Sequence, residues 1–285
     1  MPSTQKLKIS DHRRDVAGLT YVYPVISRRA GGVSVGINLN PNNACNWRCI
    51  YCQVPELKRG PAPEIDLQKL NEELRGFLRE LLDGDFLQKH VPAQARRIND
   101  IALSGNGEPT SSKQFAAVVD LIGQALEDFK LKNKIKLVLI TNGSLMARKT
   151  VQEGLAQMKT LNGEVWFKLD SASAAGMRRI NSVKRSARQT LNNLRIAVTL
   201  CPTWLQTCVF ALDGKPPSAA EQAAYLRFAG SLQKQQIAVQ GVLLYGLARL
   251  SMQPEAPRLS ALPPSWLEDF ARVIRRTGLQ VRVSA

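Results

Sequence analysis

Stretches with the pattern of buried strands alternate with stretches of helical periodicity along this 285-residue chain. Short runs rich in branched apolar side chains, typical of strands, occupy residues 33–39, 101–103, 135–140, 165–169, 205–212, 237–245 and 279–283. Apolar side chains at helical spacing fall between these runs, at residues 67–81, 115–129, 148–158, 186–198, 218–232 and 265–276. This alternation predicts βαβ units joined by right-handed crossovers, and therefore a mostly parallel sheet.

Six strand–helix units predict an α/β fold with a partial or complete (β/α) barrel, whose active site lies at the carboxyl ends of the strands. We expect one domain with an N-terminal extension over residues 1–32, a barrel core over residues 33–245 and a C-terminal helix–strand extension over residues 246–285. A hydrophobic fraction of 44% and a charged fraction of 22% suit a chain that builds its core without disulfides or metals.

No apolar run in the sequence approaches the length of a membrane span. The longest unbroken runs, residues 115–119 and 208–212, have five residues each, whereas a transmembrane helix needs ~20. The segment MPSTQKLKISDHRRD at the N-terminus also lacks an apolar stretch of signal-peptide length. We therefore expect a cytoplasmic protein with no membrane partner.

The chain is strongly basic, and the excess charge is unevenly distributed. It carries 39 Lys and Arg against 23 Asp and Glu, a net charge of +16. Residues 171–212 hold no acid but six cations, which are Arg178, Arg179, Lys184, Arg185, Arg188 and Arg195. This asymmetry favours a polyanionic partner, nucleic acid above all, and a basic solvated surface without a specific ligand is the alternative.

Three of the five cysteines crowd into eight residues. Cys45, Cys49 and Cys52 have the spacing C-x3-C-x2-C on the loop after the first predicted strand, at the catalytic rim of the expected barrel. A four-iron cluster normally takes four thiolate ligands, so three cysteines leave one iron open to a substrate or cofactor. Two alternatives remain, a Cys3His zinc site that needs His12 or His90, and three buried cysteines without a ligand.

The segment CNWRCIYC, residues 45–52, resembles the signature C-x3-C-x-aromatic-C of radical S-adenosylmethionine (radical SAM) enzymes, with Tyr51 at the aromatic position. This resemblance implies a partial (β/α)6 barrel with a [4Fe-4S] cluster on Cys45, Cys49 and Cys52, whose fourth iron binds S-adenosylmethionine (SAM). It also implies one-electron cleavage of SAM into methionine and a 5′-deoxyadenosyl radical, which abstracts hydrogen from a substrate. In such enzymes the protein orients the cofactor and excludes water.

A second segment resembles the glycine-rich motif of that superfamily, which ends in Glu and holds the amino group of SAM. It is SGNGEPT, residues 104–110, where Gly107 and Glu108 match the motif and Asn106 replaces the first glycine of the usual Gly-Gly-Glu. The resemblance implies that Glu108 binds the SAM amino group. The simpler interpretation is a strand-to-helix turn capped by residues 110–112.

Polar side chains at the ends of the next strands resemble further cofactor contacts of radical SAM barrels. The resemblance implies that Asn142, in a Thr-Asn-Gly sequence, binds the SAM carboxylate and that Asp170 binds a ribose hydroxyl. Gln206, within the fifth predicted strand, is a weaker candidate of the same kind. A turn at Asn142 and a helix cap at Asp170 are the structural alternatives.

Within the superfamily, the segments PVISRR, GINLNP and GNGEPT most resemble wyosine-type tRNA-modifying enzymes and their uncharacterised bacterial relatives. The leading hypothesis is therefore a radical SAM enzyme that modifies RNA such as tRNA, with flavodoxin or ferredoxin as electron donor. The alternatives are an activase-like radical SAM enzyme that acts on a protein or small molecule, and a non-catalytic iron–sulfur or zinc protein.

The cysteine spacing predicts that one cluster binds to Cys45, Cys49 and Cys52, and that Cys201 and Cys208 bind none. Changing any one of the first three to Ala should abolish SAM cleavage, because the cluster loses a ligand. The double change Cys201→Ala and Cys208→Ala should keep both iron and cleavage, measured by iron content and by methionine release. A folded double variant without iron would contradict the assignment.

Overall fold

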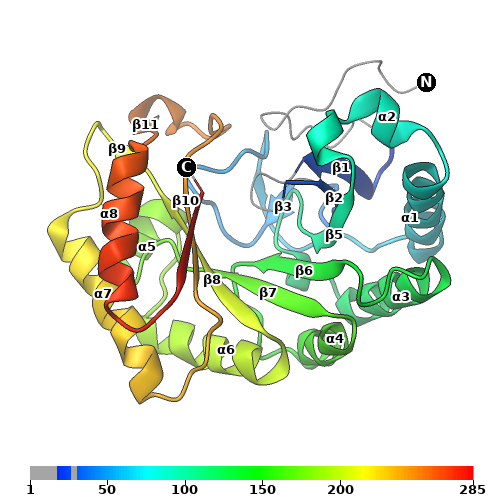
Figure 1. The fold of residues 1–285 in the computed structure, drawn as a ribbon. Coiled ribbons are helices and arrows are strands. Elements are labelled where there is room, and N and C mark those ends of the chain that lie inside the picture. The colour runs from blue at the N-terminus through cyan, green and yellow to red at the C-terminus, as the bar shows by residue number, and fades with distance from the viewer. Residues whose placement is uncertain (1–17, 27–30, 285) are drawn as a thin grey trace.

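Eight strands form one curved sheet (Figure 1). The computed structural model describes residues 18–26 and 31–284 and orders the strands β1-β2-β5-β6-β7-β8-β10-β12. The bounds are β1 Val22–Ile26, β2 Val33–Ile37, β5 Ile98–Leu103, β6 Lys136–Thr141, β7 Gly163–Lys168, β8 Thr203–Val209, β10 Val242–Gly246 and β12 Val281–Ser284. Every neighbouring pair is parallel except β1 and β2, which are antiparallel.

Six of the helices cover the outer side of this curved sheet (Figure 1). They are α1 Leu67–Leu82, α3 Phe115–Asp128, α4 Lys149–Thr160, α6 Ala187–Leu200, α7 Ala219–Lys234 and α8 Pro264–Arg275. Shorter elements are α2 Phe86–His90, α5 Ala174–Asn181, the 3-10 turns η1 Ala93–Ala95, η2 Pro109–Ser111 and η3 Ala256–Arg258, and the two-stranded pairs β3 Ala44–Cys45 with β4 Lys58–Arg59 and β9 Ala211–Leu212 with β11 Leu259–Ser260. In the described part of the chain, no helix is both long and apolar enough to cross a membrane.

Side chains along the central strands alternate between an apolar outer face and a more polar inner face. On β7, Val165 and Phe167 are buried in the main hydrophobic core, whereas Trp166 and Lys168 line a central cavity. On β8, Leu205 lies in the same core and Gln206 lines the cavity. Because successive side chains of a strand point to opposite faces, the helices bury the apolar set and leave the polar set inside the curve.

The fold class predicted from the sequence is confirmed. The six strands of the predicted barrel core correspond to β2, β5, β6, β7, β8 and β10, and the C-terminal strand corresponds to β12. The boundaries of the predicted strands differ from the observed ones by up to five residues. The largest difference is at the sixth strand, because β10 begins at Val242 and residues 237–241 form the connection that precedes it. The curved eight-stranded sheet agrees with a partial barrel.

The elements that were not predicted include β1 and α5, besides the short elements α2, β3 and β4. Strand β1 lies inside the predicted N-terminal extension and adds an antiparallel edge to the sheet, with Pro24 opposite Val35. Proline lacks a backbone N–H and is tolerated at such an edge, where one side of the strand has no partner. Helix α5 lies between β7 and α6, in a region for which no helix was predicted, and it carries Arg178 and Arg179. The division into a core and two extensions stays a prediction.

Candidate active site

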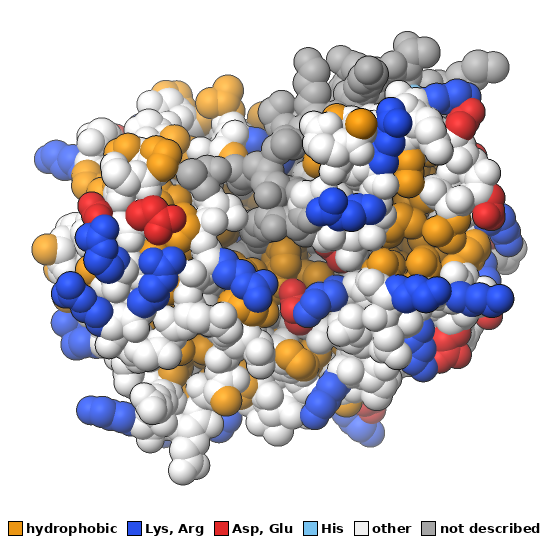
Figure 2. Space-filling view, viewed as in Figure 1, with side chains coloured by type: hydrophobic (Ala, Val, Ile, Leu, Met, Phe, Trp, Pro, Cys, Tyr) orange, Lys and Arg blue, Asp and Glu red, His pale blue; other side chains and the backbone are white. Residues whose placement is uncertain are grey.

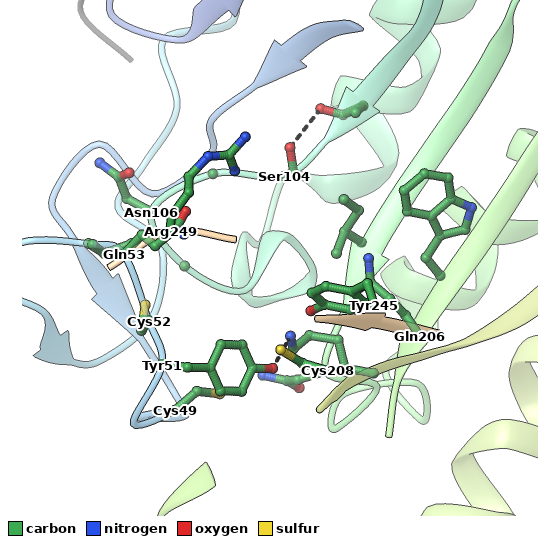
Figure 3. Close-up of a pocket in the computed structure, with 18 of the residues that line it drawn as sticks. Cys49, Tyr51, Cys52, Gln53, Ser104, Asn106, Gln206, Cys208, Tyr245 and Arg249 are labelled. Atoms are coloured by element: carbon green, nitrogen blue, oxygen red, sulfur yellow. Dashed lines mark hydrogen bonds between the residues drawn. The ribbon is translucent and has the colours of Figure 1, made fainter. Parts of the chain in front are cut away.

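A cavity of 330 Å³ lies at the inner side of the sheet, toward the carboxyl ends of its parallel strands (Figure 3). This volume falls within the ~300–1,000 Å³ range of small-molecule sites. Eight of the candidates from the sequence line it, namely Cys45, Cys49, Tyr51, Cys52, Gly107, Glu108, Asn142 and Gln206. Asp170 lines a neighbouring cavity of 720 Å³ instead.

The loop that carries the three cysteines follows β2 and packs against the end of α5. The amides of Arg48 and Ile50, on either side of Cys49, donate to the carbonyls of Asn181 at 3.2 Å and Ile180 at 2.8 Å. The last carbonyls of a helix have no partner within the helix, so these amides satisfy groups that would otherwise need a cap. The cysteine loop thereby acquires a fixed position relative to β7 and α5.

The segment after β10 holds the other side of the cysteine loop. Ser251 Oγ donates to the Ile50 carbonyl at 2.7 Å, and Met252 N donates to the Cys52 carbonyl at 2.8 Å. Gln253 Nε2 donates to the Val54 carbonyl at 2.9 Å. Glu255 forms an ion pair with Arg48 at 2.7 Å. The end of α5 and residues 251–255, which are far apart in the sequence, therefore hold the cysteine loop from two sides.

The three cysteines face the cavity as free thiols and are each half-buried. Burial raises the pKa of Cys45 to about 12, although the amide of Trp47 and the charge of Lys168 lower it, and burial also raises the pKa of Cys49. Thiols in such a setting stay protonated unless a cation replaces the proton. A cluster of iron ions supplies that positive charge, so the donor set suits a metal cluster.

The geometry separates a cluster from a single-metal site. Among residues 18–26 and 31–284, no group of three or more His, Cys, Asp or Glu side chains is placed to hold one metal ion. A four-iron cluster binds each thiolate through a different iron, so the three sulfurs need not converge on one point. His90 stacks on Phe86 with 4.7 Å between ring centroids and does not line the cavity, whereas His12 lies outside the described residues.

Glu108 lies at the end of the glycine-rich segment with its side chain almost fully buried. Oε1 accepts from Thr110 N at 3.2 Å, Thr110 Oγ1 at 2.6 Å and Thr141 Oγ1 at 2.6 Å, and Oε2 accepts from Asn142 N at 2.7 Å. Burial raises the pKa of this carboxyl group, although these four donors oppose the shift. The turn of the structural alternative is present, but Glu108 caps it at η2, whereas residues 110–112 are the cap expected from the sequence. Oε2 keeps room for a further donor.

Gly107 and Asn142 join the glycine-rich segment to the cysteine loop. A Cβ on Gly107 would lie 2.1 Å from the carbonyl oxygen of Ala44, so only glycine fits beside the backbone that leads into Cys45. Asn142 Nδ2 donates to Asn46 Oδ1 at 2.8 Å, and Asn142 Oδ1 accepts from Ser144 N at 2.9 Å. The side chain of Asn142 thus orients the cysteine loop, and its contact with SAM stays a prediction.

Tyr51, Lys168 and Asp170 form a hydrogen-bonded chain beside the cysteines. Lys168 Nζ donates to Tyr51 Oη at 2.5 Å, and Tyr51 Oη donates to Asp170 Oδ2 at 2.6 Å. Burial by itself lowers the pKa of Lys168, but Asp170 together with Tyr245, Cys49 and Cys208 outweighs it, and the pKa of Lys168 is raised. Asp170 is therefore held by protein donors, and its contact with a ribose hydroxyl stays a prediction.

Three residues of this region were missed by the sequence analysis. Lys168 and Cys208 line the cavity, and Asn181 contacts Cys49 from the end of α5. Gln206 lies opposite Lys168 in the parallel ladder of β7 and β8, so both side chains point inward together. A usable signal exists for Lys168 alone, because it lies two residues before Asp170 at the end of a strand, on the same face.

Comparisons with known proteins agree with this arrangement. A family model described as the radical SAM superfamily matches residues 39–215. A UPF0026 protein of Helicobacter pylori is 28% identical over 159 residues, which cover 55% of this chain and 44% of that protein. A UPF0026 protein of Methanocaldococcus jannaschii is 30% identical over 165 residues, which cover 55% of this chain and 42% of that protein. The chain spans less than half the length of these two relatives.

Solved structures share the fold at low sequence identity. A radical SAM methyltransferase from Sphaerobacter thermophilus superposes with a TM-score of 0.60 and 13% identity, covering 92% of this chain and 68% of that one. The structure of TYW1 with a lysine-pyruvate adduct bound superposes with a TM-score of 0.52 and 18% identity, covering 87% of this chain and 74% of that one.

The contacts of Glu108 lead to a prediction about SAM affinity. A charge-assisted hydrogen bond to an ammonium contributes ~1.5–3 kcal/mol, so Glu108→Ala should weaken SAM binding roughly tenfold to a hundredfold while the cluster remains. Anaerobic calorimetry on the reconstituted protein measures this change. Thr141→Val is the matched control, because it removes one bond to Oε1 and leaves the charge. Equal SAM affinity in wild type and Glu108→Ala would mean that the segment is only a turn.

Proposed function

The chain belongs to the radical SAM superfamily, and from this premise we propose that it cleaves SAM reductively in the cavity and modifies RNA. One observation carries the proposal. The three cysteines, Glu108 and Asn142 come from separate segments and meet around one cavity at the carboxyl ends of neighbouring strands. In barrels of this kind the active site assembles at that end.

Each residue around the cavity has a distinct role in this proposal. Cys45, Cys49 and Cys52 would hold a [4Fe-4S] cluster, which when bound would supply the electron for the reductive cleavage of SAM to methionine and a 5′-deoxyadenosyl radical. Glu108 Oε2 holds the amino group of SAM, and Asn142 holds its carboxylate. Tyr51, buried and fixed by Lys168 and Asp170, orients the backbone between Cys49 and Cys52. The cavity wall keeps bulk water from the reacting groups.

Charge supports RNA as the substrate class. Lys and Arg outnumber Asp and Glu on the face seen in Figure 2. Arg178, Lys184 and Arg188 are exposed on α5, on the α5–α6 loop and in the first turn of α6, and within the described residues none of them pairs with an acid. These three cations lie at the end of the barrel where the cavity opens, so they are placed to contact phosphates.

Two other cations of the same segment, Arg179 and Arg185, make contacts within the protein. Arg179 forms an ion pair with Glu221. Arg185 donates to the carbonyl of Gly143 at 3.1 Å and lies 5.9 Å from the ring of Trp47, and burial lowers its pKa to about 10. Of the five cations of residues 178–188, the proposed RNA contacts therefore include only the three that are exposed and pair with no acid among the described residues.

The resemblance of the sequence to wyosine-type enzymes also supports RNA. A cytoplasmic location would give the protein access to tRNA and to a flavodoxin or ferredoxin as the electron donor. No second cysteine cluster accompanies the first, since Cys201 lies in the core and donates to the Gly163 carbonyl at 3.4 Å. The reaction proposed here therefore needs one cluster alone.

The chemistry and the substrate class are tested in one experiment. The protein is reconstituted anaerobically with iron and sulfide, reduced with dithionite and incubated with SAM and bulk tRNA. We expect methionine and 5′-deoxyadenosine, together with a nucleoside of changed mass in the tRNA digest. Iron-loaded protein that leaves SAM intact would favour a non-catalytic iron–sulfur protein, and SAM cleavage with unaltered tRNA would favour a protein or small-molecule substrate.

Salt dependence tests the RNA contacts directly. The slope of log affinity against log salt is near −0.7 per phosphate contact for single strands, so the triple change Arg178→Ala, Lys184→Ala and Arg188→Ala should flatten it by roughly two units. SAM cleavage without RNA should not change. Filter binding with tRNA over a salt series measures the slope.

A matched triple variant controls for total charge. Lys134, Lys159 and Lys234 are exposed and lie within four residues of the starts of β6, β7 and the β10 connection, at the end of the sheet opposite the cavity. Changing these three to Ala should leave the slope as in the wild type. Equal slopes in both triple variants would show that the cations of residues 178–188 are only solvated.

A further inference from the structure

Asn181, the last residue of α5, is fully buried beside the cysteine loop. Its Nδ2 donates to Cys49 Sγ at 3.2 Å and to Asp170 Oδ2 at 2.8 Å. An amide nitrogen carries two hydrogens, so one serves the sulfur and the other the carboxylate. The side chain thus connects a cluster ligand to the Tyr51–Asp170 pair on the far side.

Asp170 fixes which end of the amide faces the sulfur. Its Oδ2 also accepts from Tyr51 Oη at 2.6 Å, and its Oδ1 accepts from Cys208 N at 3.2 Å. These donors keep the carboxylate in place. If the amide of Asn181 turned over, its oxygen would meet the carboxylate oxygen, and two acceptors would repel each other.

The observed orientation leaves one group unsatisfied. Asn181 Oδ1 is buried and has no hydrogen-bond partner among the described residues. A buried acceptor without a donor is unfavourable, and buried amides in proteins rarely remain so. The site keeps the orientation that presents N–H groups to Cys49 and Asp170 in spite of this cost.

We propose that Asn181 is a positioning residue that directs an N–H group to Cys49 Sγ and thereby raises the reduction potential of the cluster. The inference rests on the proposed function, since it needs the cluster on Cys45, Cys49 and Cys52. Reduction takes one electron from an external donor and adds negative charge to the cluster and its sulfurs, with no proton transferred. A hydrogen bond to a ligand sulfur stabilises that added charge.

This contact differs from the one at Cys45. Cys45 Sγ accepts from the backbone amide of Trp47 at 3.4 Å, which no side-chain substitution removes. The donor to Cys49 is a side chain from a different segment. Its effect on the potential can therefore be tested without altering the cysteine loop itself.

The test compares three reconstituted variants with the wild type. Asn181→Leu keeps a similar volume and removes the donor, whereas Asn181→Ser keeps a smaller hydroxyl donor. Thr203→Val is the control, because it removes one buried hydrogen bond, to the Cys201 carbonyl, at the opposite end of β8. Iron and sulfide content establish that each protein holds its cluster, and a redox titration followed by electron paramagnetic resonance gives the midpoint potential.

We expect Asn181→Leu to shift the potential to a more negative value, Asn181→Ser to shift it less, and Thr203→Val to leave it unchanged. Wild-type potentials in both Asn181 variants with a full cluster would overturn the inference and leave the proposed function standing. A wild-type protein that holds no cluster would overturn both.

A measurement on the wild type covers the case in which the variants do not fold. With asparagine labelled by ¹⁵N at the side-chain amide, pulsed electron paramagnetic resonance of the reduced cluster should show hyperfine coupling to that nitrogen. Absence of this coupling would also overturn the inference.

Discussion

The structure depends on a parallel sheet that buries its apolar side chains against helices on one face alone. Val165 and Phe167 fill that core, while their neighbours Trp166 and Lys168 point into the curve. The burial of large apolar side chains stabilises the curved shape, since each provides roughly 1.5–3 kcal/mol. The inner face is then free to carry polar groups, and among the described residues no second layer of helices fills the curve, which leaves room for the cavity.

The alternation of strand and helix patterns predicted most of the fold, because those patterns are local and the connections of βαβ units have a fixed hand. It failed at β1 for a physical reason. Residues 22–26 contain Pro24, which argues against a strand unless the position at the sheet edge is known. Helix α5 has 8 residues, so its periodicity is short, and it is stabilised by the cysteine loop packed against its end.

Some residues of the candidate site could likewise be predicted from the sequence, and others could not. Cys45, Cys49 and Cys52 lie within one short segment, and Glu108 ends a glycine-rich turn, so both carried a local signal. Asn181 carried no local signal, and Lys168 carried only its position two residues before Asp170. Their roles arise from contacts with Cys49 and Tyr51 across more than a hundred residues of chain. Asp170 shows the reverse case, since its position at a strand end suggested a ligand contact while its carboxylate is engaged by the protein.

The contacts that hold the cysteine loop determine when the loop can reach its final shape during synthesis of the chain. The loop is held by Ile180 and Asn181 on one side and by residues 251–255 on the other, so its final shape requires nearly the whole chain. A nascent chain that has emerged only as far as α3 therefore has all three thiols but not their arrangement. If the loop holds the cluster that we propose, the cluster would bind after translation, once residues 251–255 have packed against the loop.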